Sequence, residues 1–261
     1  MDDSLKNSLW NYTSEAIGRG IYSWYDALKV YYIDYYKFSV DDLPGNEFCK
    51  DDLNEYFFDG DWYEVYNFIE FTMHNLSEIA QHIKITKEQF EEGLNEILKR
   101  ELAGYRSINL EIIPITDDNE IASIRSAITV SDKHGFNGIK KHFENSLSLL
   151  GKKPEPDYLN SIKESISAVE GICKILTSEK SGGIEKALRK LETKIKLHPA
   201  FRQGISNFYG YTSDEDGIRH PILEDSEVDF ADAKFMLVSC SALVNYIIEK
   251  AIIHNLIPEV S

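Results

Sequence analysis

Residues 157–176, DYLNSIKESISAVEGICKIL, carry a clear helical pattern. Apolar side chains return every three to four residues over five turns, so they share one face of an α-helix. The residues of this face are Ile162, Ile166, Val169, Ile172 and Leu176. Asp157 stands before the pattern and is a residue type that caps helix N-termini. A helix with one apolar face packs against other helices, so this stretch predicts a helical bundle.

The segments on both sides of this helix continue the pattern. Further helices are predicted over 121–130, 138–150 and 184–195, from Pro199 onward, and over 228–253. The last of these carries an apolar stripe made of Phe230, Ala233, Leu237, Cys240, Val244, Ile247 and Ala251. The second half of the chain is therefore predicted to be a bundle of four or more helices, with a long loop between the last two.

The first hundred residues also predict helices. They are two within residues 1–40 that break near Gly18–Gly20, one at 50–58, one at 61–80, and one that starts at the capping-box pair Thr86 and Gln89 and runs to about 103. Tyrosines recur at helical spacing between 22 and 36. This stripe could stack bases or belong to the core, and the core is favoured because Asp26 and Asp34 lie among the rings and would repel phosphate.

The period changes at residues 105–115, YRSINLEIIPI. The stretch is rich in β-branched residues, Asn109 suits a turn, and Pro114 suits a sheet edge. It predicts a small β-hairpin and the border between two domains, residues 1–117 and 118–261. The predicted fold class is mostly all-α, with an N-terminal helical domain that ends in the hairpin and a helical bundle that follows.

The charge is uneven along the chain. The formal net charge is −16, and 24 of the 44 acidic residues, but only 10 of the 28 Lys and Arg, precede Glu120. Tight non-specific binding of nucleic acid needs Lys and Arg to neutralise phosphates, so this composition argues against it. A local basic segment lies between Lys180 and Arg202, and it is either an anion-binding surface or a solvated helix face.

Targeting and cysteine patterns bear on the compartment. The first ten residues, MDDSLKNSLW, are acidic and lack the apolar run of a signal peptide, and no stretch predicts a membrane span. Three cysteines, Cys49, Cys173 and Cys240, show neither zinc-ligand spacing nor a disulfide framework. We therefore expect a cytoplasmic protein that uses no metal and no cofactor.

Residues 207–221, NFYGYTSDEDGIRHP, are predicted to be a loop that carries the functional site. Aromatic, acidic and glycine residues surround the adjacent pair Arg219 and His220. Metal-free RNA cleavage needs a base for the 2′-hydroxyl and a cation for the phosphate, and His and Arg suit these roles. Alternatively, Arg219 pairs with the acids of residues 214–216 or with Glu164 or Glu170, and His220 hydrogen-bonds a helix end, so that both lock the loop.

Motifs of several enzyme classes are absent from the sequence. It contains no glycine-rich phosphate loop, no His-Glu-x-x-His and no Gly-x-Ser-x-Gly. These absences argue against nucleotide hydrolases, zinc proteases and serine hydrolases.

Three C-terminal segments, SIKESISAVEGICKIL, YGYTSDEDGIRHP and FADAKFMLVSCSALVNYII, resemble abortive-infection-like proteins with a C-terminal domain of the HEPN superfamily. The segments LKNSLWN, FFDGDWYEVYNFIE and GYRSINLEIIPI resemble the AbiJ-type N-terminal domain that accompanies it. HEPN ribonucleases have an Arg followed, after four to six residues, by a His. In this sequence His220 follows Arg219 directly.

The resemblance implies an antiphage protein with a HEPN-like ribonuclease toxin. The candidate catalytic residues are Arg219, His220 and Glu164, and the candidate substrate-binding residues are Tyr209, Tyr211, Lys163 and Arg202. Because Arg219 and His220 are adjacent, two copies of the loop would assemble a site more easily than one, which favours a homodimer through the C-terminal bundle. The expected partners are an RNA substrate, tRNA or mRNA, and a protein or phage-derived trigger. The alternative is a non-catalytic HEPN-like module that binds RNA, a nucleotide or a protein.

Overall fold

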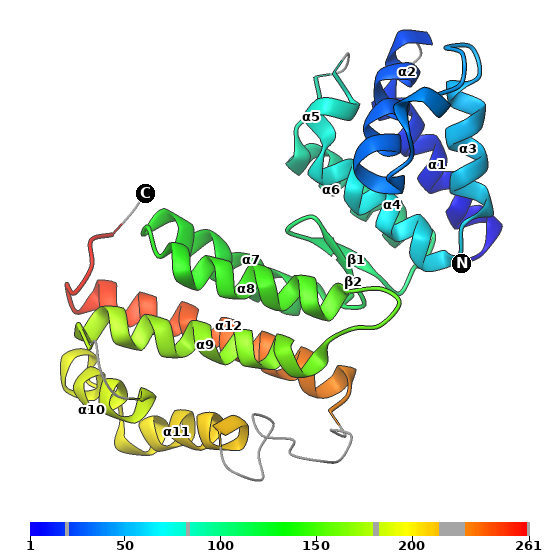
Figure 1. The fold of residues 1–261 in the computed structure, drawn as a ribbon. Helices are drawn as coiled ribbons and strands as arrows, with labels where there is room; N and C mark the ends of the chain where they lie inside the picture. Colours follow the sequence, from blue (N-terminus) through cyan, green and yellow to red (C-terminus); the bar gives the residue numbers. More distant parts are fainter. Residues whose placement is uncertain (19–20, 82–83, 180–182, 214–227, 260–261) are drawn as a thin grey trace. The chain divides into compact units, whose positions relative to one another are not determined.

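The computed structural model describes residues 1–18, 21–81, 84–179, 183–213 and 228–259. Within these ranges the regular elements are helices and one small antiparallel hairpin (Figure 1). The prediction of a mostly all-α fold is therefore confirmed. Contacts divide the chain into two compact units, Met1–Pro114 and Ile115–Ser261.

The first unit is built from helices and the hairpin. Its helical elements are α1 (Asp3–Ile17), α2 (Ile21–Val30), a π-helix (Tyr31–Tyr36), a short 3-10 helix (Val40–Asp42), α3 (Cys49–Asp59), α4 (Trp62–His74), α5 (Leu76–Ile79) and α6 (Lys87–Arg100). The predicted break after the first helix begins at Gly18, whose φ of 108° favours glycine. The predicted capping box at Thr86 and Gln89 is present.

Aromatic side chains fill the core of this unit. The ring centroid of Trp10 lies 5.2 Å from that of Phe57, and Tyr31 stacks on Phe68 at 4.4 Å. Trp24, Tyr31 and Tyr32 are buried, so this part of the tyrosine stripe belongs to the core, as favoured. The backbone differs from an ordinary helix because residues 31–36 wind as a π-helix, which shifts the side chains after Tyr31 around the axis.

The prediction of a single helix over 61–80 is wrong at its C-terminal end. The structure has α4 ending at His74 and the short α5 following it. Asn75 explains the break, because its side-chain amide donates to the carbonyl of Phe71 at 2.9 Å. A local side-chain bond of this kind competes with helix continuation, and the sequence period alone does not reveal it.

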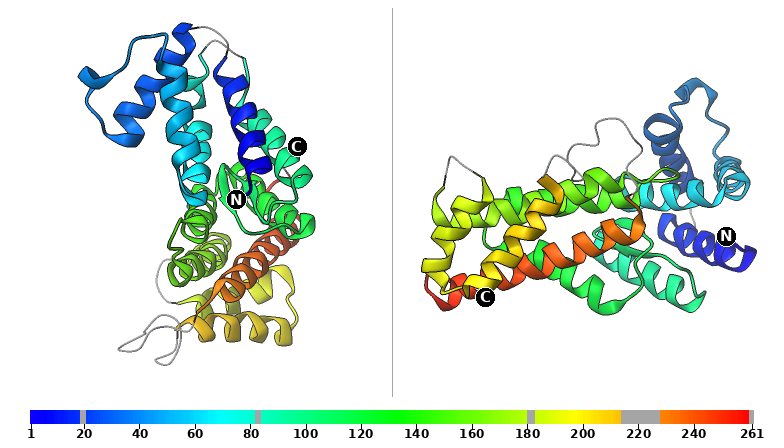
Figure 2. Two further views of the ribbon diagram at one scale, coloured as in Figure 1. Left: turned by 90° about the vertical axis from the view of Figure 1, so that its right-hand side faces the viewer. Right: turned by 90° about the horizontal axis from the view of Figure 1, so that it is seen from below.

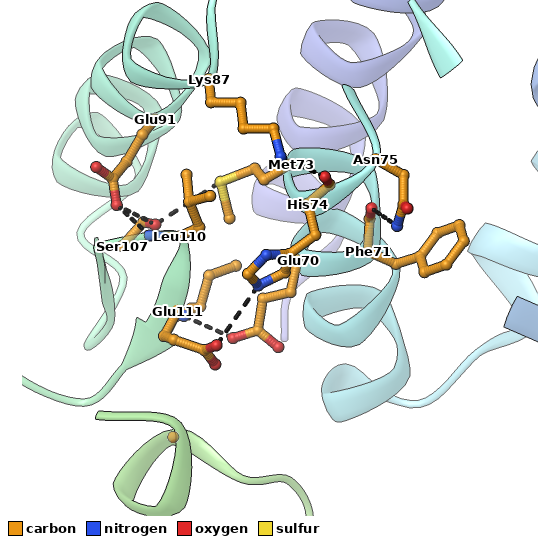
Figure 3. A network of polar contacts seen from close by, with 12 residues as sticks. Glu70, Phe71, Met73, His74, Asn75, Lys87, Glu91, Ser107, Leu110 and Glu111 are labelled. Carbon is orange, nitrogen blue, oxygen red and sulfur yellow. Dashed lines mark hydrogen bonds and ion pairs between the residues drawn. The ribbon is translucent and has the colours of Figure 1, made fainter. Parts of the chain in front are cut away.

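The hairpin pairs β1 (Arg106–Ile108) with β2 (Glu111–Ile113). Asn109 and Leu110 both have positive φ, 54° and 70°, as a two-residue hairpin turn of type I′ requires. Helices α4 and α6 hold the hairpin through carboxylates that accept from its backbone (Figure 3). Glu91 Oε1 accepts from Leu110 N at 2.8 Å and Glu70 Oε1 from Ile112 N at 2.6 Å. Acidic side chains therefore fix a strand pair that is too short to be stable alone.

The second unit is a helical bundle. Its helices are α7 (Asp118–Lys133), α8 (Asn137–Gly151), α9 (Tyr158–Thr177), α10 (Ile184–Ile195), α11 (Pro199–Ser213) and α12 (Phe230–Ile253). Helices α7, α8, α9 and α12 pack on one another, and the pair α10 and α11 adds to α9 (Figures 1 and 2). Asp157 caps α9 as predicted, with its side chain accepting from Asn160 N.

Helix α12 has the length and mean hydropathy of a membrane span, although the sequence was expected to contain none. Its packing accounts for much of its apolar character. Residues of the predicted stripe are buried against the bundle, among them Leu237, Cys240, Val244 and Ile247. By its contacts with α7 and α9 it is a core helix of this unit.

The predicted start of the loop after α11 is wrong. A loop was expected from Asn207, whereas the helix continues through Ser213. Tertiary packing overrides the loop-like composition, because the ring of Phe208 packs against that of Phe235 on α12 with centroids 5.7 Å apart. Residues 214–227, which include Arg219 and His220, lie outside the described residues.

Candidate functional site

Helices α8 and α9 bring a histidine and a carboxylate together on the second unit. His142 Nδ1 lies 2.7 Å from Glu164 Oε2, and Asn145 Nδ2 donates to the same oxygen at 3.3 Å. The side chains of His142 and Glu164 are 37% and 28% exposed. The pair is thus held by two helices and remains accessible from solvent.

Small residues set the distance between these two helices. Ser146, Ser161 and Ser165 are fully buried, and Ser146 Oγ lies 2.9 Å from Ser161 Oγ and 2.8 Å from Ser165 Oγ. A Cβ added at Gly171 would lie 2.5 Å from Ile139 Cδ1. Because short side chains line the contact, the helices approach closely and the longer His142 and Glu164 meet at its solvent edge.

The arrangement suits acid–base chemistry. A carboxylate on Nδ1 of a neutral imidazole favours the tautomer with the proton on that nitrogen. Nε2 is then the nitrogen left to accept a hydrogen bond, and the contact with Glu164 fixes the orientation of the ring. The same division of roles occurs in catalytic triads.

His142 was missed by the sequence analysis. It lies 22 positions from Glu164 and on another helix, so no local spacing connects the two. The run of Lys140, Lys141 and His142 is indistinguishable, at the level of sequence, from a solvated helix face. Only the register of α8 against α9 reveals the pair.

The predicted residues Glu164 and Lys163 are neighbours on α9. Glu164 contacts His142 and Asn145, as described above. Lys163 is half-buried, and its carbonyl accepts from Ser167 Oγ at 2.8 Å. Glu170, considered as another acceptor for Arg219, forms an ion pair with Lys174 at 2.6 Å.

The predicted residue Arg202 lies on α11 and faces α10. Its guanidinium is 2.8 Å from Glu192 Oε2 and 3.4 Å from Glu185 Oε2, so it holds the two helices together. Other cations of this basic segment are also paired, since Lys186 Nζ lies 2.9 Å from Glu179 Oε1. The acids offset much of the positive charge that the sequence concentrates here.

The remaining predicted residues fall at or beyond the end of α11. Tyr209 is half-buried on this helix. The backbone of Tyr211 belongs to α11, and its side chain, like Arg219 and His220, lies outside the described part of the chain. The structure therefore gives Glu164 a contact with His142, shows no contact between the described side chains of Glu164 and its sequence neighbour Lys163, and does not describe the predicted catalytic pair.

An apolar cavity of about 660 Å³ lies between α11 and α12. Aromatic side chains stand around it, and Phe201 and Tyr246 pack at 5.1 Å between ring centroids. Phe235 and Phe201 are 57% and 41% exposed. Small exposed residues such as Gly204 and Ala242 also line it, so exposed rings and small side chains lie next to one another on this surface.

The cysteines do not provide a reactive group. Burial raises the pKa of the Cys173 and Cys240 thiols to about 12, so both stay protonated at neutral pH. Among the described residues, no three His, Cys, Asp or Glu side chains come together in a way that could hold a metal ion.

Comparison with protein families bears on the first unit. Residues 1–130 match the family model described as AbiJ N-terminal domain 4. The chain thus carries an AbiJ-type N-terminal domain, and such a domain suggests an abortive-infection, defence-type protein. Comparison with curated proteins and with solved structures gives no significant match.

Proposed function

We propose that this chain is an antiphage, abortive-infection protein whose C-terminal bundle is a HEPN-like, metal-independent ribonuclease. The observation that carries the defence role is the AbiJ-type N-terminal domain over residues 1–130. The ribonuclease role rests on the resemblance of the C-terminal segments to HEPN proteins and on the chemistry of the side chains. The protein would act in the cytoplasm, where its RNA substrate is found.

The chemistry requires a base, an acid and a cation. A histidine removes the proton of a ribose 2′-hydroxyl, the oxygen attacks the adjacent phosphate, and the bond to the 5′-oxygen of the next nucleotide breaks. A second group returns a proton to that oxygen, while Arg219 stabilises the charge that builds on the phosphate. His220 and His142 are the candidate acid and base, and Glu164 would serve by orienting His142.

A homodimer through the C-terminal bundle completes the proposal. The aromatic cavity between α11 and α12 supports it, because Phe201, Phe235 and Tyr246 protrude beside small residues. A two-fold contact buries the same patch on both copies. In such a dimer Arg219 of one copy and His220 of the other would act on one phosphate.

A second candidate is a non-catalytic HEPN-like module that binds RNA, a nucleotide or a protein. The direct succession of Arg219 and His220 favours this alternative, because HEPN ribonucleases have four to six residues between the Arg and the His. In both cases a protein or phage-derived trigger would control the protein through its N-terminal domain.

The test is a phage challenge of cells that express the full chain. Wild type should reduce plaque formation and degrade cellular RNA, and the Arg219→Ala, His220→Ala double variant should do neither at equal expression. Protection without RNA loss, unchanged in the double variant, would favour the binding module. No protection by either protein at several expression levels would contradict the defence role.

A further inference from the structure

A cavity of about 340 Å³ lies in the first unit, beside the π-helix, α3 and α4. Three half-buried tyrosines line it, Tyr35 and Tyr36 from the π-helix and Tyr56 from α3. The buried rings of Phe57 and Phe68 also line it, which closes its inner end. Aromatic rings therefore make up much of the wall of this cavity.

The rings of the three tyrosines pack on one another at different angles. The centroid of Tyr36 lies 4.8 Å from that of Tyr35, with the planes at 79°, and 4.6 Å from that of Tyr56, with the planes at 32°. The planes of Tyr35 and Tyr36 thus stand nearly at a right angle, and an aromatic ring attracts a cation that lies over its face. The π-helix places Tyr35 and Tyr36 here, and π-helical turns occur frequently at functional sites.

The charged lining of the cavity is acidic. Asp59 and Glu64 line it, and among its described lining residues neither Lys nor Arg occurs. Burial and the charge of Glu64 raise the pKa of Tyr35 to about 12, so the phenol stays neutral. Lys6 Nζ donates to the carbonyls of Phe58 and Gly60 at 2.6 and 2.9 Å. Its ammonium group therefore binds the carbonyls at the C-terminal end of α3.

We propose that this tyrosine pocket binds an alkylated ammonium group, with the rings facing the methyl groups and Asp59 and Glu64 supplying the opposite charge. The acidic residues exclude the phosphate of a nucleotide by repulsion. A neutral ligand of the same shape gains the apolar contact alone. The pocket lies entirely within the first unit and needs no residue of the proposed ribonuclease site.

The experiment is a calorimetric titration of the full chain with choline, with its neutral isostere 3,3-dimethyl-1-butanol, and with AMP. Choline should bind at least about fivefold more tightly than the isostere, because cation–π and charge contributions act only on the cation. Binding should weaken as salt rises. A peptide with a trimethylated lysine, titrated separately, distinguishes a free cation from a side chain as the source of the group.

Two variants locate the site. Glu64→Gln removes the charge but keeps the helix capping box, since Gln also occupies this position in such boxes, and it should weaken choline binding severalfold with an unchanged melting temperature. Tyr36→Leu removes a wall and should weaken it further. Glu55→Gln, an exposed acid on α3 outside the lining, is the matched control and should bind as wild type.

Three results would overturn the proposal. Equal binding of choline and its isostere would show that the cavity recognises apolar surface and not the positive charge. Binding of AMP without choline would make the rings a base-stacking surface. Absence of choline binding to the folded wild type at millimolar concentration would show that the pocket holds no ammonium group.

Discussion

At the scale of single residues, the structure gives Glu164 a partner that its position in the sequence does not suggest. The carboxylate contacts His142 across the interface of α8 and α9. Both side chains are partly exposed, so the pair faces solvent although Glu164 lies in a helix of the bundle. If the bundle cleaves RNA, the two side chains should differ in what their loss does. The histidine would transfer the proton, and the carboxylate would only position it.

His142→Ala should therefore lower RNA cleavage by about 100-fold or more, in line with loss of a general acid–base group, while the melting temperature changes little. Glu164→Gln should lower it less, because the histidine stays in place and loses only the carboxylate that orients it. His134→Ala, at the turn between α7 and α8, is the control and should cleave as wild type. Equal activity of all three variants would remove this pair from the site.

A second residue pair makes stability depend on pH. The hydrogen bond and charge of Glu111 raise the pKa of His74, whose Nε2 lies 3.5 Å from Glu111 Oε1 (Figure 3). A raised folded pKa means that the contribution is full below the unfolded pKa of about 6.5 and is lost as pH rises through the folded value. The His74 side chain is 48% exposed, so the gain is about 1 kcal/mol or less.

The melting temperature of wild type should thus exceed that of His74→Gln at pH 5.5, and the difference should shrink towards pH 8.5. Glu111→Gln should abolish the pH dependence of the difference. A gap between wild type and His74→Gln that grows with pH would contradict the assigned direction of the pKa shift.

At the scale of elements, the contact of α8 with α9 depends on a buried hydroxyl cluster. Ser146 Oγ contacts Ser161 and Ser165 within 2.9 Å, and removing it leaves buried polar atoms with fewer partners. Ser146→Ala should destabilise the bundle by about 1–3 kcal/mol. Ser148→Ala, on the exposed side of the same helix, should leave the unfolding midpoint in denaturant unchanged. Equal midpoints for the two variants would show that the cluster adds no stability.

The elements also show which parts of the fold the sequence predicts and which it does not. Helix α9 was predictable because a cap and five apolar residues agree, and the hairpin because β-branched residues flank Asn109. The break at Asn75 was not predictable, since it depends on a hydrogen bond from the Asn75 side-chain amide to the carbonyl of Phe71. The helical conformation of residues 207–213 was missed because it depends on Phe208 meeting Phe235, which lies 27 positions away.

At the scale of the whole molecule, the family match and the helix contacts place α7 in different halves of the chain. The family match extends through most of it, to residue 130, whereas its contacts are with α8 and α12 of the bundle. Its buried face, Ile121, Ile124, Ala127 and Ile128, needs those helices. The predicted division into 1–117 and 118–261 assigns α7 to the bundle.

We therefore expect 118–261 to fold by itself, with a cooperative loss of helical circular dichroism on heating, and 134–261, which lacks α7, to lose that cooperativity. A fragment of residues 1–117 should also unfold cooperatively. If 1–117 is unfolded while 1–133 folds, the border instead lies after α7, as the extent of the family match suggests.

The most direct test of the central proposal is cleavage of RNA by the purified full chain in the presence of EDTA. We expect wild type to cleave single-stranded RNA and to leave 2′,3′-cyclic phosphate ends, because the 2′-oxygen attacks the phosphate. The Arg219→Ala, His220→Ala variant should be inactive and should melt at the same temperature as wild type. Cleavage that is unchanged in this variant, or no cleavage by a folded wild-type dimer, would contradict the assignment of the C-terminal bundle as a ribonuclease.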